Sequence, residues 1–159
     1  MEKVLKRILK VFSWSSFLLM GTIIIQVLLR YGLNQGMVGL EELQWHFFAI
    51  LILTGLSFAE LNRAHVKVDV ISHHFSRKTN AIIEIFGYIF LLFPFLLIVF
   101  YHSLDFVGDS FSRMERSISP AGLSYRWVIK SFMPISMILF LLSGFLNVLK
   151  NIKVIKRGS

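Results

Sequence analysis

The chain has 159 residues, of which 55% are hydrophobic and only 16% are charged, whereas a soluble domain is about 45–50% apolar and about 25% charged. This composition argues against a soluble globular protein, and the absence of cysteine excludes disulfides, thiolate nucleophiles and thiolate metal sites. The net charge of +8 would suggest nucleic acid in a soluble protein, but the basic residues flank apolar runs, so we expect contact with anionic lipid and no nucleic-acid partner.

Four apolar runs along the chain are long enough to predict transmembrane helices, which need about 20 residues each. They cover residues 11–29, 43–59, 81–101 and 128–149, and the second is the shortest. The first run follows a basic leader, as in a signal peptide, but it is too long for one and no small-residue cleavage site follows it. We therefore expect a permanent anchor and an all-α membrane protein with a single four-helix domain, residues 1–159.

The distribution of basic residues predicts the orientation of these helices. Twelve of the 17 Lys and Arg residues lie in the N-terminal segment, the middle connection and the C-terminal tail. The positive-inside rule assigns these three regions to the cytoplasm, and an even number of spans agrees because it places both termini on one side. Aromatic residues near the run ends fit the interfacial belts of a bilayer: Trp14, Tyr31, Trp45, Tyr101, Tyr125 and Trp127.

The connection after the second run predicts a short amphipathic helix on the membrane surface. Leu61, Ala64, Val68, Ile71 and Phe75 recur at spacings of three and four, which is the apolar stripe of a helix. Alternating valines would also allow a strand, but a lone strand at a membrane surface leaves backbone groups unpaired.

No enzyme motif appears among the polar residues, so we expect neither catalysis nor a cofactor. The one alternative is a haem held by His46 and His102, which the topology places at similar depth on the outer face. Glu84 and Lys130 lie inside the runs but near their ends, where we expect them to reach the interface rather than to form an ion relay.

Small residues and prolines inside the runs predict how the helices pack. Gly55 and Ala59 form a small-x-x-x-small pair that lets another helix approach closely, and Ser143 with Gly144 offers the same on the fourth run. The prolines inside the third and fourth runs are expected to kink their helices. The long outer connection after the third run is a candidate docking surface or a solvated loop, and its basic residues Arg113, Arg116 and Arg126 suit an acidic partner surface.

The stretch RYGLNQGMVGLEELQWHFFAILILTGLSFAELNRAHVKVDV resembles the small membrane subunit of TRAP transporters, the tripartite ATP-independent periplasmic carriers. The matching features are the Arg-Tyr pair that closes the first span, the acidic pair that opens the second, the glycine within it and the His-x-x-x-Asp exit. These are Arg30, Tyr31, Glu41, Glu42, Gly55, His65 and Asp69. Near the end, GLSYRWVIKSFMP is similar to the family's entry to the fourth helix, although Ser124 stands where the family often has proline.

This resemblance implies a DctQ-like, non-catalytic subunit in the bacterial inner membrane. It implies two partners: a large multi-span membrane subunit that carries the substrate and sodium sites, and a periplasmic substrate-binding protein. The implied substrate is an organic acid such as a C4-dicarboxylate or sialic acid, and we favour sialic acid although no residue decides it. A free-standing carrier or channel and a haem-anchoring redox subunit are the alternatives.

The resemblance also suggests roles for individual residues. Arg30 would pair with Glu41 or Glu42 and tie the first two helices at the outer interface, or else the three charges are separately solvated. His65 and Asp69 are four residues apart, so a helix places them on one face, where they would anchor the surface helix or simply contact the interface.

Overall fold

A computed structural model describes residues 2–64 and 75–157, and every structural statement below concerns these residues. Within them the chain is helical and contains no strand. The elements are α1 (Glu2–Ser13), α2 (Ser15–Gly32), α3 (Val38–Leu61), α5 (Arg77–Gly87), the π-helical turn η1 (Tyr88–Leu92), α6 (Phe93–Ser112) and α7 (Trp127–Arg157).

Four helical segments are long and apolar enough to cross a membrane: Glu2–Gly32, Val38–Leu61, Arg77–Ser112 and Trp127–Lys156. Each contains one of the four predicted runs, so the predicted all-α architecture with four spans is confirmed. The helices are longer than the runs because their polar ends are helical too. Arg77–Ser112 has 36 residues and is therefore about 54 Å long, against a hydrocarbon core of ~30 Å.

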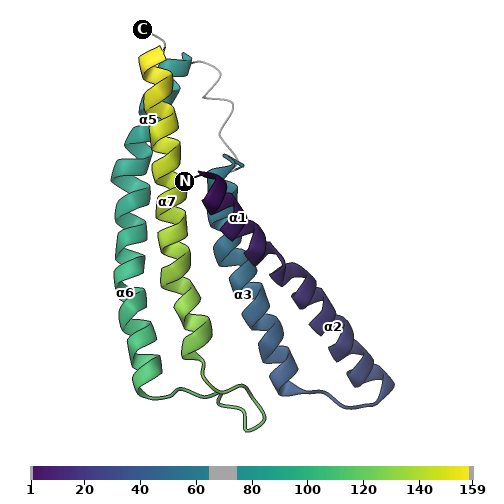
Figure 1. Ribbon diagram of the computed structural model, residues 1–159. Helices are drawn as coiled ribbons and strands as arrows, with labels where there is room; N and C mark the ends of the chain where they lie inside the picture. Colours follow the sequence, from purple (N-terminus) through teal and green to yellow (C-terminus); the bar gives the residue numbers. More distant parts are fainter. Residues whose placement is uncertain (1, 65–74, 158–159) are drawn as a thin grey trace.

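Both described ends of the chain lie at the same end of the molecule, opposite the α2–α3 and α6–α7 connections (Figure 1). We call the end with the termini the inner end and the opposite end the outer end. Most of the predicted surface helix between the second and third spans falls on residues 65–74, which lie outside the described residues, so for them it stays a prediction. The ends of its predicted apolar stripe are wrong, because Leu61 is instead the last residue of α3 and part of the core, and Ala64 and Phe75 are not helical.

Local chemistry explains where the helices begin and end at the inner end. Arg63 follows α3 with a left-handed backbone (φ 53°), and the Ala64 amide donates to the Ala59 carbonyl at 2.8 Å. This is the hydrogen bond that closes a helix with a left-handed residue after its last turn. At the start of α5, the Ser76 hydroxyl accepts from the Thr79 amide at 3.1 Å and caps the helix.

The third span contains a π-helical turn directly before a proline. The Phe93 amide donates to the Tyr88 carbonyl, five residues earlier, and Pro94, which has no amide hydrogen to donate, follows in the first turn of α6. This turn packs on Gly144 of α7, where an added Cβ would lie 3.0 Å from the Phe93 ring and 3.4 Å from Leu92. Gly144 is therefore the small residue at which two helices approach closely, as predicted.

The last helix, α7, is the centre of the bundle. Half of the residues in its most apolar window are buried, against 6–11% for the other three spans. Its buried face carries small and polar residues at helical spacing: Ser136, Ser143, Asn147 and Asn151. The apolar core joins this helix to α1 and α3 through Leu5, Leu9, Leu61, Leu139 and Leu146, with Phe12 packed against them.

Candidate functional site

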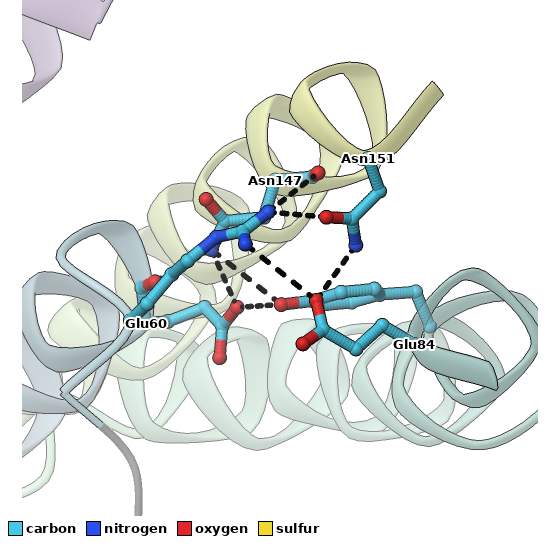
Figure 2. A network of polar contacts seen from close by, with 6 residues as sticks. Glu60, Glu84, Asn147 and Asn151 are labelled. Carbon is cyan, nitrogen blue, oxygen red and sulfur yellow. Dashed lines mark hydrogen bonds and ion pairs between the residues drawn. The ribbon is translucent and has the colours of Figure 1, made fainter. Parts of the chain in front are cut away.

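A network of polar side chains connects α3, the α5–η1 segment and α7 at the inner end (Figure 2). We call it the inner polar network; its members are Glu60, Arg63, Glu84, Tyr88, Asn147 and Asn151. Glu60 is only 7% exposed, and Asn147 and Asn151 are 0% and 1% exposed. Polar groups buried this deeply remain favourable only when they are hydrogen-bonded.

One half of the network is centred on the Glu60 carboxylate. It accepts a hydrogen bond from the Tyr88 hydroxyl and another from the Asn147 amide nitrogen at 2.8 Å. The same Asn147 nitrogen donates to the Glu60 backbone carbonyl at 2.6 Å. Glu60, at the end of α3, is thereby held by both of the other helices.

The other half is centred on Glu84 of α5. Its carboxylate accepts from the Asn151 amide nitrogen at 2.8 Å and forms an ion pair with Arg63 at 3.8 Å. The Arg63 guanidinium also donates to the Asn151 side-chain oxygen. Arg63 reaches both groups because it lies two residues after the end of α3, so the turn that ends α3 also positions the network's cation.

Sequence reasoning missed this network. It treated Glu84 as a charge that reaches the interface, and it gave Glu60 no role. The available signal was the pair Asn147 and Asn151, four residues apart at the end of the fourth apolar run. Such spacing places two amides on one face, and amides inside an apolar span usually bond across helices.

A second polar cluster fixes the outer α6–α7 connection onto the start of α3. We call it the outer polar cluster: Glu42, Glu115, Ser117, Lys130 and the backbone amide of Leu123. The Glu42 carboxylate accepts from the Ser117 hydroxyl and from the Leu123 amide at 2.6 Å. The connection is also closed on itself, because the Ser117 amide donates to the Leu123 carbonyl at 3.1 Å.

Lys130 of α7 completes the outer polar cluster. Its ammonium forms a charge-assisted hydrogen bond with the Glu115 carboxylate and lies 4.0 Å from the centre of the Phe106 ring. This hydrogen bond is the largest of the effects that hold the pKa of Glu115 below its ordinary value. Lys130 lies near the end of its helix, as predicted, and has a defined partner there.

The structure separates Arg30 from the acidic pair that the resemblance assigned to it. Glu41 accepts from the Gln26 side chain at 3.1 Å, and Glu42 is turned toward the outer connection. In the described part of the chain no ion pair joins Arg30 to either acid. The first two spans are tied by Gln26 and by a Gln44 side chain that donates to the Thr22 carbonyl at 3.2 Å.

Two other predicted site residues that the structure describes, Gly55 and Trp45, lie on α3. A Cβ at Gly55 would meet nothing within 4 Å, so no described helix is in contact at that position, which lines an open groove beside α1. Trp45 is 69% exposed and contacts only the edge of Phe48 among the aromatic rings described. His65 and Asp69 lie outside the described residues, so their anchoring role stays a prediction.

The three arginines predicted to dock a partner differ in their surroundings. Arg113 and Arg116 are exposed, and Arg113 makes a solvent-exposed ion pair with Asp109 at 3.6 Å. Arg126 is half-buried; its backbone amide donates to the Glu115 carbonyl at 3.1 Å, and its charge helps to lower the pKa of Glu115. Arg126 therefore belongs with the outer polar cluster.

The histidines among the described residues are His46 and His102. His46 contacts the Glu42 carbonyl through Nδ1 at 2.5 Å. Over residues 2–64 and 75–157, no group of three or more His, Cys, Asp or Glu side chains is arranged to hold a metal ion.

Comparison with known proteins identifies the family to which the chain belongs. The family model described as "Tripartite ATP-independent periplasmic transporters, DctQ component" matches residues 19–154. No curated protein gives a significant match to the chain. Since the matched range includes most of the chain and both polar ends of the bundle, the chain belongs to the DctQ family and is a small, multi-pass membrane subunit of a TRAP transporter.

Proposed function

We propose that this subunit is a rigid scaffold for the large membrane subunit of its transporter and does not itself carry substrate. In this proposal the large subunit performs sodium-coupled uptake of an organic acid delivered by a periplasmic binding protein. A C4-dicarboxylate or sialic acid is the proposed substrate, as the resemblance implies. The family match supports the subunit's place in such a complex.

The observation that carries the scaffold role is the amount of apolar surface that the chain leaves uncovered. In three of the four spans only 6–11% of the most apolar window is buried. The third span alone exposes Phe90, Leu91, Phe95, Ile98 and Tyr101, each at 60% or more. Uncovered apolar helix faces suit contact with lipid and with another membrane protein.

The second support is the pair of polar clusters at the two ends of the bundle. The inner polar network ties three helices, and the outer polar cluster ties the long connection to α3. Because lipid provides no hydrophobic force between helices, such interhelical hydrogen bonds and close-packed small residues hold the bundle together. The arrangement suits a framework that stays fixed while a partner moves.

We propose that the inner end faces the cytoplasm and the outer end the periplasm. The basis is the concentration of Lys and Arg residues in the regions at the inner end. The outer connection then presents exposed Arg113, Arg116 and Ile118 (97% exposed) to the periplasmic binding protein. Reporter fusions to each terminus test the orientation, and a periplasmic signal from either would contradict it.

Reconstitution tests which of the two membrane subunits is needed for substrate uptake. The chain and the large subunit are co-expressed, purified through a tag on the chain alone, and placed in liposomes with the binding protein and a sodium gradient. We expect the two subunits to copurify and uptake to require both. Liposomes that hold only this chain are the control, and substrate accumulation in them would contradict the scaffold role.

A further inference from the structure

A groove of about 600 Å³ runs between α1 and α3 near the inner end. On α1 it is lined by Lys6, Leu9, Lys10 and Ser13, and on α3 by Leu51, Thr54, Gly55, Phe58 and Asn62. On each helix the lining residues follow the i, i+3, i+4 and i+7 spacing of one helix face, so one stripe of each helix faces the groove. Because the helices run in opposite directions (Figure 1), the start of α1 lies beside the end of α3.

The groove has a charged end and an apolar end. Lys6 and Asn62 lie toward the chain terminus and the end of α3, whereas Leu51 and Thr54 lie deeper along α3. The Thr54 hydroxyl donates to the Ile50 carbonyl of its own helix at 2.6 Å. The Thr54 hydroxyl proton therefore needs no further acceptor, and the methyl group of Thr54 is suited to an apolar wall.

The two lysines differ in their partners. Lys6 pairs with Glu2 at 3.1 Å, and Glu2 also pairs with Lys150 at 3.2 Å. Lys10 makes no ion pair with any residue of the described ranges. The acidic group near this end of the groove is thus shared between two lysines, and positive charge remains in excess.

We propose that this groove binds one anionic phospholipid, with the headgroup at Lys6 and Lys10 and an acyl chain along Leu51, Gly55 and Phe58. Basic pockets between membrane helices suit anionic headgroups, and each lysine near the membrane surface contributes to the attraction. The open space beside Gly55, where a Cβ would meet nothing within 4 Å, leaves room for a chain of methylenes. An amphiphile matches both ends of the groove, whereas a wholly apolar partner helix would offer nothing to the excess positive charge and would leave Lys10 without an ion pair in the described ranges.

Lipid selectivity of the unmodified protein is the first test. The full chain, alone and copurified with the large subunit, is titrated in detergent with phosphatidylglycerol or with phosphatidylcholine of the same acyl chains, and bound lipid is counted by native mass spectrometry. We expect phosphatidylglycerol to bind at least about fivefold more tightly, and its advantage to fall as salt rises. Equal retention of the two lipids would overturn the proposal, and this result does not depend on any variant folding.

Matched charge variants are the second test. The double variant Lys6→Gln, Lys10→Gln should lose affinity for phosphatidylglycerol by at least about fivefold, the effect of about 1 kcal/mol for a single lysine. Lys3→Gln, Arg7→Gln removes the same charge from the same helix at positions that do not line the groove, and it should bind as the unmodified chain does. An equal loss in both double variants would mean diffuse surface attraction and would refute the site.

Gly55→Leu is the third test, because it fills the groove without meeting another atom of the chain at its Cβ. We expect it to reduce retention of both lipids, since the acyl chain and not the headgroup is excluded. Unchanged lipid retention would overturn the proposal. If Gly55→Leu instead abolished copurification with the large subunit and left lipid retention intact, the occupant would be a partner helix.

Discussion

Replacing Asn147 by leucine should destabilise the bundle more than any conservative change on an exposed face. The residue is 0% exposed, and its amide nitrogen makes hydrogen bonds of 2.6 Å and 2.8 Å to the backbone and side chain of Glu60. Leucine has nearly the same shape but no donor. The substitution therefore removes both bonds between α7 and α3 with little change in volume.

The magnitude follows from those two bonds. Interhelical hydrogen bonds in membrane proteins average about 0.6 kcal/mol and reach about 1.7 kcal/mol, and a buried acceptor left without its donor costs about 1–3 kcal/mol. Glu60 keeps the Tyr88 hydroxyl as a donor, so we expect a loss of about 2 kcal/mol. For a chain of this size that lowers the melting temperature by about 4–8 °C.

Circular dichroism of the purified chain in a mild detergent measures the change. Ser131→Ala is the matched control on α7, because the Ser131 hydroxyl bonds only to the Trp127 carbonyl of its own helix. Tyr88→Phe, alone and combined with Asn147→Leu, completes a double-mutant cycle, in which a shared acceptor should make the effects non-additive. If Asn147→Leu melted within about 1 °C of Ser131→Ala, the inner polar network would not stabilise the bundle and the reasoning would be wrong.

Two further predictions concern the outer polar cluster. Gly122→Ala should displace the outer connection, because a Cβ there would lie 2.3 Å from the Ser117 hydroxyl. Trypsin should therefore cleave the connection faster in Gly122→Ala than in the control Gly108→Ala, where a Cβ meets nothing within 4 Å. The pKa of Glu115 is lowered mainly by its hydrogen bond with Lys130. The charged carboxylate therefore stabilises the fold at a pH above its ordinary pKa of 4.5. This stabilisation is lost as the pH falls through the lower pKa of the folded state. Titration of the labelled carboxyl carbon by NMR should give a midpoint below 4.5 that rises in Lys130→Gln, and an unchanged midpoint would count against the pair.

The spans were predictable because they depend on composition over about 20 residues, which a single sequence displays directly. Their full length was less accessible. The basic segment before the first run folds as α1. Its lysines interrupt its apolar residues, so it does not stand out as part of an apolar run in the sequence. Its apolar face, Leu5 and Leu9, is part of the core.

The polar contacts were harder to predict because they depend on which faces of distant helices meet. Glu60 and Asn147 are 87 positions apart, and periodicity within one helix does not identify its neighbour. The acidic pair at the start of α3 is visible in the sequence, but the partner of Glu42 is set by the folded connection at Ser117 and Leu123. No pattern in the connection itself, apart from its glycine and serines, indicates that fold.

The placement of polar contacts explains how a chain with so few buried residues keeps one arrangement. An apolar helix face is solvated equally well by lipid and by a neighbouring helix. Apolar contact alone therefore does not select how one span is aligned against another. Directed hydrogen bonds at the inner end and a folded connection at the outer end do select it, and Gly144 lets α7 approach the third span between them. Because each end of the bundle is fixed by contacts within the chain, the middle of the second and third spans can stay apolar on the side that faces away from the bundle. That face is the surface on which a larger membrane subunit can assemble without competing for the bonds that hold the scaffold together.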